Sequence, residues 1–260
     1  MTLWERARPS RSHSLPRFSR WLSHLGLVVL STVLLRILFP LAAVGMAAIA
    51  AERGWGLWNQ LPMPMGLAVV LSIVALDLVI YWQHRLFHAL PLLWRLHKVH
   101  HADQDFDVTT GFRFHPLEIL LSMGIKIIAV ALLGAPGIAV LIFEVLLNGT
   151  ALFNHGNVSL PLFLDRWLRW VVVTPDMHRI HHSVVPQETN SNFGFNLPWW
   201  DRLLGTYQSQ PFRGQQGMVI GLSEYQQDPR VAQLPWMLVL PFLPVSQPVS
   251  GHDPDTELHG

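Results

Sequence analysis

Four long apolar segments divide the chain and leave few folds open to it. They cover residues 26–51, 66–82, 117–135 and 136–153. A helix needs about 20 apolar residues to cross the hydrocarbon core of a bilayer, so each segment is long enough or nearly so. Only 13% of the residues are charged, against about 25% in a typical soluble domain. We therefore predict an all-α, multi-pass membrane bundle of about four transmembrane helices.

Ionisable side chains interrupt these segments and constrain how the helices pack. They are Arg36, with Pro40 nearby, Asp77, Lys126 and Glu144. An ion at the centre of a bilayer costs at least about 2.5–3.5 kcal/mol on insertion scales. We expect these four side chains to face other helices or to snorkel. Residues 133–137 hold two glycines and a proline, and they predict a tight turn that joins the last two segments as a helical hairpin.

The distribution of Lys and Arg predicts which end of the bundle faces the cytoplasm. Five arginines precede the first segment, whereas the 52–65 loop carries only Arg53. The polar regions after the second and fourth segments carry further basic residues. We expect a basic cytoplasmic tail at 1–22, a first membrane helix and loop at 23–65, and a main domain at 66–210. Residues 211–260 are expected to form a tail with an interfacial segment at 234–245 and a disordered polar end.

The chain has no cysteine, which removes disulfides, iron–sulfur clusters, thiolate zinc sites and cysteine nucleophiles from consideration. Any metal must be held by His, carboxylate or amide groups. The net charge of +1 gives no indication of a nucleic-acid partner.

Histidine recurs at spacings that place several imidazoles on one helix face. His84 and His88 are four residues apart, and the pattern H-x-x-H-H occurs twice, at 97–101 and 178–182. Residues three and four apart share a helix face. Roughly 0.04 matches to H-x-x-H-H are expected by chance at this histidine content. The candidate metal ligands are His84, His88, His97, His100, His101, His178, His181 and His182, joined by the single residues His155 and His115.

The expected topology brings all these histidines to the cytoplasmic face. So many imidazoles exceed the four ligands of one zinc ion and indicate two metal ions. Imidazole suits iron, zinc, copper and nickel alike, so the ligand type does not select one metal. His115 is balanced between binding a metal directly and supporting a ligand.

Three further side chains are candidate site residues. Asp77 lies on one helix stripe with His84 and His88, where it either accepts the second ring N–H of an inward histidine or packs between helices. Asn192 is a site contact or a turn residue. Asp201, together with its neighbours Trp199 and Trp200, either contacts substrate or anchors the polar region at the interface.

These motifs resemble the fatty acid hydroxylase / sterol desaturase superfamily over about residues 70–210. The matching stretches are 77–88, 97–101, 113–118, 154–157, 178–182, 192–194 and 200–207. The resemblance implies that 66–210 is a catalytic domain with a membrane-embedded di-metal centre, normally two iron ions. It implies dioxygen as co-substrate and hydroxylation or desaturation of a sterol, fatty acyl or carotenoid-like lipid. It assigns Asp77, Asn192 and Asp201 as candidate catalytic residues.

The same resemblance leaves two points to settle. Some members have a second histidine four residues before the position of His155, where this chain has Ala151, so the number of ligands stays open. No fused cytochrome domain is visible, and we expect a separate electron donor such as a ferredoxin, cytochrome or reductase.

Other functions fit the histidines less well. A metal-dependent hydrolase would be expected to show H-E-x-x-H, which is missing. A metal-binding or transport protein would place ligands along the membrane path. Bis-histidine haem ligation would leave the adjacent His-His doublets unexplained.

Overall fold

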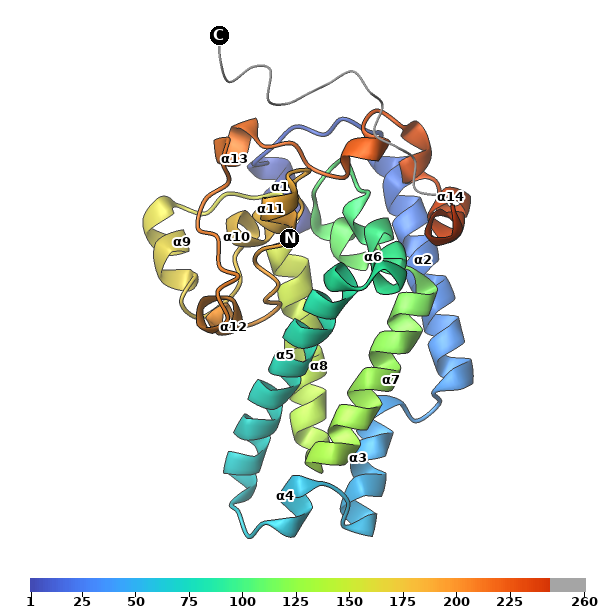
Figure 1. The fold of residues 1–260 in the computed structure, drawn as a ribbon, viewed down its shortest axis with the longest axis vertical. Coiled ribbons are helices and arrows are strands. Elements are labelled where there is room, and N and C mark those ends of the chain that lie inside the picture. Colours follow the sequence, from blue (N-terminus) through green and yellow to red (C-terminus); the bar gives the residue numbers. More distant parts are fainter. Residues whose placement is uncertain (244–260) are drawn as a thin grey trace.

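The computed structural model describes residues 1–243, and in that part of the chain the regular structure is helical (Figure 1). The long helices are α2 (Arg17–Leu38), α3 (Ala42–Arg53), α5 (Met65–Ala89), α7 (Pro116–Leu133) and α8 (Gly137–Asn154). The shorter ones are α1 (Thr2–Ala7), α4 (Leu57–Gln60), α6 (Pro91–His101), α9 (Leu162–Leu168), α10 (Pro175–His181), α11 (Pro186–Thr189), α12 (Trp199–Leu203), α13 (Gly214–Gly217) and α14 (Leu234–Val239). Four 3₁₀ turns complete the list: η1 (Val108–Phe112), η2 (Ser223–Tyr225), η3 (Pro229–Ala232) and η4 (Leu240–Phe242).

Four of the described helical segments are long and apolar enough to cross a membrane, which confirms the predicted class. They are α5, α7, α8 and the combined stretch of α2 to α4. In an apolar stretch of 18 residues within each candidate span, between 17% and 33% of the residues are buried inside the protein. The remaining apolar side chains point outward, as expected when the surrounding solvent is lipid.

The first apolar segment is broken, so the single membrane helix expected there is two helices. α2 ends at Leu38 and α3 begins at Ala42. Pro40 lies between them and has no backbone N–H to continue the helical ladder. The break lets the chain shift sideways and continue down the bundle as α3 (Figure 1).

The predicted hairpin between the last two spans is present. α7 ends at Leu133 and is capped by Gly134, which adopts the left-handed conformation with φ +67°, and Pro136 is the N-cap of α8. Gly56 packs directly on this turn, since a β-carbon there would lie 2.0 Å from the backbone nitrogen of Gly134. A side chain at either glycine would force the turn and the α3–α4 loop apart.

Helices α3, α5, α7 and α8 form the inner core of the bundle through Ala47, Leu76, Val130 and Phe143. Small alanines let the helices approach closely, as is common in membranes. The ion pair between Lys126 Nζ and Glu144 Oε1, at 2.8 Å, joins α7 to α8. These two charges therefore face neighbouring helices, as expected.

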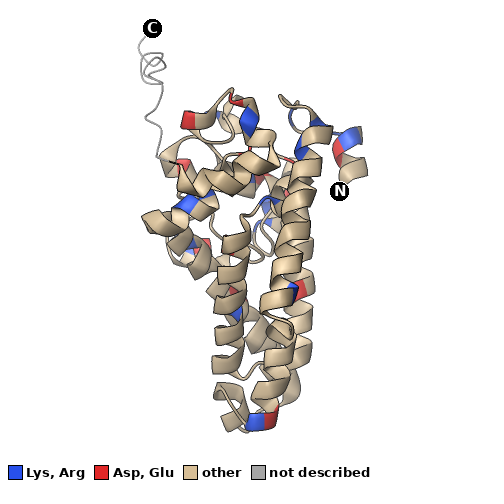
Figure 2. Ribbon diagram, turned by 90° about the vertical axis from the view of Figure 1, so that its right-hand side faces the viewer, with Lys and Arg blue, Asp and Glu red and all other residues tan. Residues whose placement is uncertain are grey.

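A polar cap covers one end of the bundle, and charged residues are concentrated there (Figure 2). It contains the N-terminal residues, the α6–α7 connection and most of the chain after α8 (Figure 1). Within the cap, α14 and η4 bury Met237 and Leu240 against α2 and α6 and leave Val239 and Phe242 exposed. The predicted interfacial segment extends beyond this to 245. Its last two residues and the polar end predicted to be disordered lie outside the described residues.

Candidate metal centre

Within residues 1–243, nine histidines gather into two adjoining groups at the junction of bundle and cap. In each group the ligand nitrogens lie within 4.8 Å of one another. The five-histidine group consists of His84, His88, His97, His101 and His181, and the four-histidine group consists of His100, His155, His178 and His182. Eight are buried and His88 is half-buried. The expectation that distant histidines share one pocket is confirmed.

The geometry of a helix explains the His-His doublets. Residues four apart lie on one face, so His97 and His101 join the same group while His100 turns toward the other. The second triplet does the reverse, because His178 and His182 share a group and His181 crosses over. The ring centroids of His101 and His181 are 4.6 Å apart, as are those of His100 and His182. Each triplet thus supplies ligands to both groups.

Short distances between ring nitrogens indicate where ions would lie. The Nε2 atoms of His84 and His97 are 3.1 Å apart. His155 Nε2 lies 3.2 Å from His100 Nε2 and 3.0 Å from His178 Nε2. Two nitrogens bound at right angles to one ion at about 2.1 Å would be about 3.0 Å apart. The spacing therefore fits first-row metal ions, one in each group.

Second contacts fix the tautomer of several rings. The Nδ1 atoms of His84, His181 and His155 donate to the backbone carbonyls of Phe193, Ser191 and Ala151, at 2.8–2.9 Å. A carbonyl oxygen only accepts, so Nδ1 must carry the proton and Nε2 keeps its lone pair for a metal. In His97 the same role falls to Glu118, whose Oε1 lies 2.6 Å from Nδ1.

Burial also keeps the rings outside the membrane spans in the neutral form that metals bind. It lowers the pKa of His155 to about 4. Burial and the neighbouring imidazoles hold the pKa values of His100, His101, His178, His181 and His182 well below the ordinary range. Among the described residues, both nitrogens of His101 and His182 have no hydrogen-bond partner. Unpaired buried nitrogens in such number fit a site built for metal ions.

Asp77, Asn192 and Asp201 are buried, but their hydrogen bonds run to residues of the cap and not to the histidine rings. Of the two roles left open for Asp77, the contact with a histidine is not made: its carboxylate accepts from Asn196 Nδ2, Leu197 N and Trp200 Nε1. The loop after α11 and the start of α12 therefore supply three donors to this carboxylate.

The other two residues shape the backbone that holds the rings. Asn192, at φ +51°, donates to Met177 O and Gln208 O, and it lies between the carbonyls that hold His181 and His84. Asp201 accepts from the backbone nitrogens of Phe193 and Gly194, both at 2.8 Å. Burial raises the pKa of Asp201 to about 6, against the effect of these hydrogen bonds.

His115 belongs to neither group. It caps α7, where Nδ1 accepts from Leu117 N, and Nε2 lies 3.3 Å from Leu238 O. Its neighbour Glu118 is the residue that reaches the site, and sequence reasoning placed it only as part of a motif. One signal was available, since Glu118 follows His115 by three residues and so lies one helical turn further along α7.

A cavity of about 410 Å³ opens between α2, α5, α7 and α8 directly beneath the histidines, and we call it the membrane cavity. Phe114, Phe195 and Ala151 close the end nearest the site. Phe114 stacks on His100 with ring centroids 4.2 Å apart, and Phe195 lies 6.4 Å from both His84 and His155. A β-carbon at Gly111 would lie 3.1 Å from Ala151 O and 3.2 Å from His155 Nδ1, so a side chain there would press on the smaller histidine group.

The fatty acid hydroxylase family model matches residues 69–206, more than half of the chain, and this range contains all nine grouped histidines. The chain belongs to the fatty acid hydroxylase family. The two histidine groups are built entirely inside the matched region, and so are the spans α7 and α8.

Relatives in this family act on several lipids. Ornithine lipid hydroxylase OlsE of Rhizobium tropici is 36% identical over 66% of this chain and 51% of its own length. Human alkylglycerol monooxygenase is 25% identical over 54% of this chain and 30% of its own, and a rice very-long-chain aldehyde decarbonylase is 28% identical over 71% and 30%. The chain thus aligns with about half of OlsE and a third of the others. No solved structure matches.

Proposed function

We propose that the chain is a membrane oxidoreductase that binds two iron ions and uses dioxygen to hydroxylate a C–H bond of a lipid. The observation that carries the proposal is that Phe114 and Phe195, which line one end of a mostly apolar cavity within the bundle, pack on rings of the two histidine groups. The relatives named hydroxylase and monooxygenase support hydroxylation over desaturation.

The chain's own residues would hold, orient and isolate the centre. The nine grouped histidines are the proposed ligands, and His115 is left out because it caps α7. When bound, the iron pair would supply the electrons and Lewis acidity that dioxygen activation requires. Four histidines in one group and five in the other leave coordination positions free, and Ala151 places one side of the smaller group against the cavity.

The cavity explains how an apolar chain would reach the site without water. Its wall is formed by membrane helices, so a lipid acyl chain can enter between them from the bilayer. Phe114 and Phe195 place aromatic surface between the cavity and the rings, which favours a hydrocarbon segment over water at that end.

We place the cap and its histidines on the cytoplasmic side. The distribution of basic residues supports this, because the cap end carries most of them and the opposite loop has only Arg53 (Figure 2). A separate donor protein, such as a ferredoxin, a cytochrome or a reductase, would deliver electrons from that side.

The test combines metal analysis with lipid analysis. Protein purified without oxidation or chelators should contain about two iron ions per chain. The lipids of cells that express the gene should gain a species heavier by one oxygen than in cells without it, detected by mass spectrometry. Zinc alone in active protein would indicate a hydrolase, and a haem absorption band would indicate haem ligation. A lipid that has lost two hydrogens would indicate desaturation.

A pair of histidine variants gives the matched control. His181→Ala should lose iron and abolish turnover while the helices still insert, because the ring of His181 packs against His84 and His101 inside the five-histidine group. His115→Ala should keep both iron ions. Full turnover in His181→Ala would remove that residue from the ligand set, and loss of iron in His115→Ala would add His115 to it.

A further inference from the structure

The membrane cavity is apolar over much of its wall, yet it contains two buried polar atoms that lack a partner among the described residues. They are the side-chain oxygen of Gln83 on α5 and the hydroxyl of Ser31 on α2. Both residues line the cavity, and Ser31 is 6% exposed. A buried acceptor without a donor costs free energy, so each such atom in a native protein calls for an explanation.

The geometry of Gln83 is specific. Its Nε2 donates to Ser122 Oγ at 2.9 Å, and this hydrogen bond fixes the plane of the amide. The opposite oxygen is then held in place with its lone pairs unused. Gln83 immediately precedes His84, so this acceptor lies within one residue along α5 of a proposed ligand.

We propose that Gln83 recognises the substrate by accepting a hydrogen bond from a hydroxyl or an amide N–H of the lipid in the membrane cavity. The inference rests on the proposed function and narrows it to a substrate class: acyl lipids that carry a hydrogen-bond donor close to the carbon that reacts. Esters and ethers, which have no donor, would leave the oxygen unpaired and would bind less well. Ser31 supplies a second polar contact on the opposite helix.

Three synthetic lipids of equal chain length isolate the donor. They are a secondary amide with two alkyl chains, its N-methyl derivative, and the corresponding ester. The N-methyl amide keeps the carbonyl and loses only the N–H. Binding is measured by native mass spectrometry on the full-length protein without metal, so that no turnover occurs. The wild-type protein should bind the secondary amide up to about tenfold more tightly than the other two.

The variant Gln83→Met keeps the length of the side chain and removes the acceptor. It should bind all three lipids equally. Gln210→Met makes the same change at an exposed position in a loop outside the cavity and should keep the wild-type preference. The circular dichroism of both variants checks that they fold.

Two outcomes would overturn the inference. The first is equal binding of the three lipids to the wild-type protein, which is also the result expected if water alone occupies the cavity. The second is an unchanged preference for the secondary amide in Gln83→Met. If that variant does not fold, the wild-type comparison decides alone. A preserved amide preference in a protein that never oxidises lipid would instead refute the proposed function and leave this inference standing.

Discussion

At the scale of single residues, the site is defined by what lies behind each imidazole. Three rings donate through Nδ1 to backbone carbonyls and one to Glu118. A ring held in this way presents Nε2 at a fixed angle, so the cost of ordering ligands is met before a metal binds. Three of these four partners are backbone carbonyls, whereas Glu118 contributes its side chain. Its contact can therefore be removed by a substitution.

Replacing that carboxylate tests the arrangement. Glu118→Gln should lower metal affinity by about 10- to 100-fold, the usual cost of losing a second contact behind a metal-binding histidine. The affinity is measured by competition with a chelator of known strength. Glu52→Gln changes the same group at an exposed position at the far end of α3 and should leave affinity unaltered. Unchanged affinity in Glu118→Gln would show that His97 is not oriented through this contact.

Sequence spacing predicted the ligands better than their supports, for a physical reason. Metal ligands are side chains of particular residue types. The helical spacing of four residues therefore allows His97 and His101 to be recognised in the sequence as a pair on one helix face. Any residue type can supply a backbone carbonyl such as Phe193 O, so the sequence does not show which residue supports a ring in this way. The role of Asp201, which holds the backbone at Phe193, could therefore not be predicted. Two roles stayed open for Asp77 because its stripe on α5 was visible in the sequence but the loop that covers it was not.

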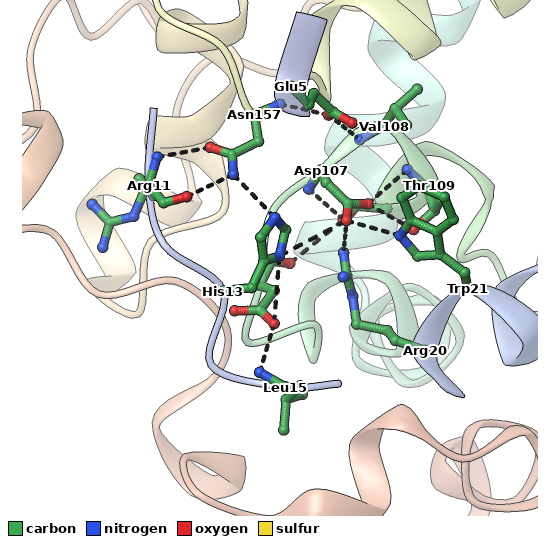
Figure 3. Close-up of polar contacts among 12 residues, drawn as sticks. Glu5, Arg11, His13, Leu15, Arg20, Trp21, Asp107, Val108, Thr109 and Asn157 are labelled. Atoms are coloured by element: carbon green, nitrogen blue, oxygen red, sulfur yellow. Dashed lines mark hydrogen bonds and ion pairs between the residues drawn. The ribbon is translucent and has the colours of Figure 1, made fainter. Parts of the chain in front are cut away.

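At the scale of elements, the N-terminal segment is a structural part of the cap and not a loose basic tail. Glu5 on α1 accepts from the backbone nitrogens of Val108 and Asn157, both at 2.8 Å (Figure 3). Asn157 Oδ1 in turn accepts from Arg11 N, and Asp105 accepts from Ser14 N at 2.7 Å. The loops tied together here follow His101 and His155, so residues 1–16 brace the chain just beyond two proposed ligands.

This brace should depend on acid pH. Burial alone would raise the pKa of Asp105, but hydrogen bonds from His13, Ser14 and Leu15 lower it to about 2. A carboxyl whose folded pKa is depressed contributes stability that is complete above its ordinary pKa near 4 and lost as the pH falls toward 2. Hydrogen exchange of residues 1–16 should therefore accelerate, after correction for intrinsic rates, as the pH falls from about 4 to about 2.

The variant Asp105→Asn separates this carboxyl from other titrating groups. It should exchange faster at the N-terminus already at neutral pH and should show a weaker dependence below pH 4, since no charge remains to be lost. Equal protection in variant and wild type across the range would mean that other contacts, such as those of Glu5, hold the segment. Both proteins are compared in the same detergent, so effects of acid on the micelle cancel.

At the scale of the whole molecule, the membrane cavity lies within the bundle, and small side chains line its end nearest the histidines. Hydropathy predicted the membrane spans because a span is recognised from the apolar composition of its own segment. It could not predict the cavity, which depends on how α2, which ends before the break at Pro40, lies against α7. Ala151 is the smallest residue at the end nearest His155 apart from Gly111.

Filling that end should separate metal binding from turnover. Ala151→Leu adds bulk where the cavity meets the four-histidine group but leaves all nine proposed ligands in place. We expect both iron ions to remain and turnover to fall about 100-fold, because a shift of about 1 Å in the position of a reacting group has effects of that size. Ala48→Leu makes the same change on the exposed face of α3 and should retain full activity. Wild-type turnover in Ala151→Leu would mean that the substrate reaches the metals by another route. The alternative would be a separate pocket of about 320 Å³ in the cap, which is bordered by the half-buried His88.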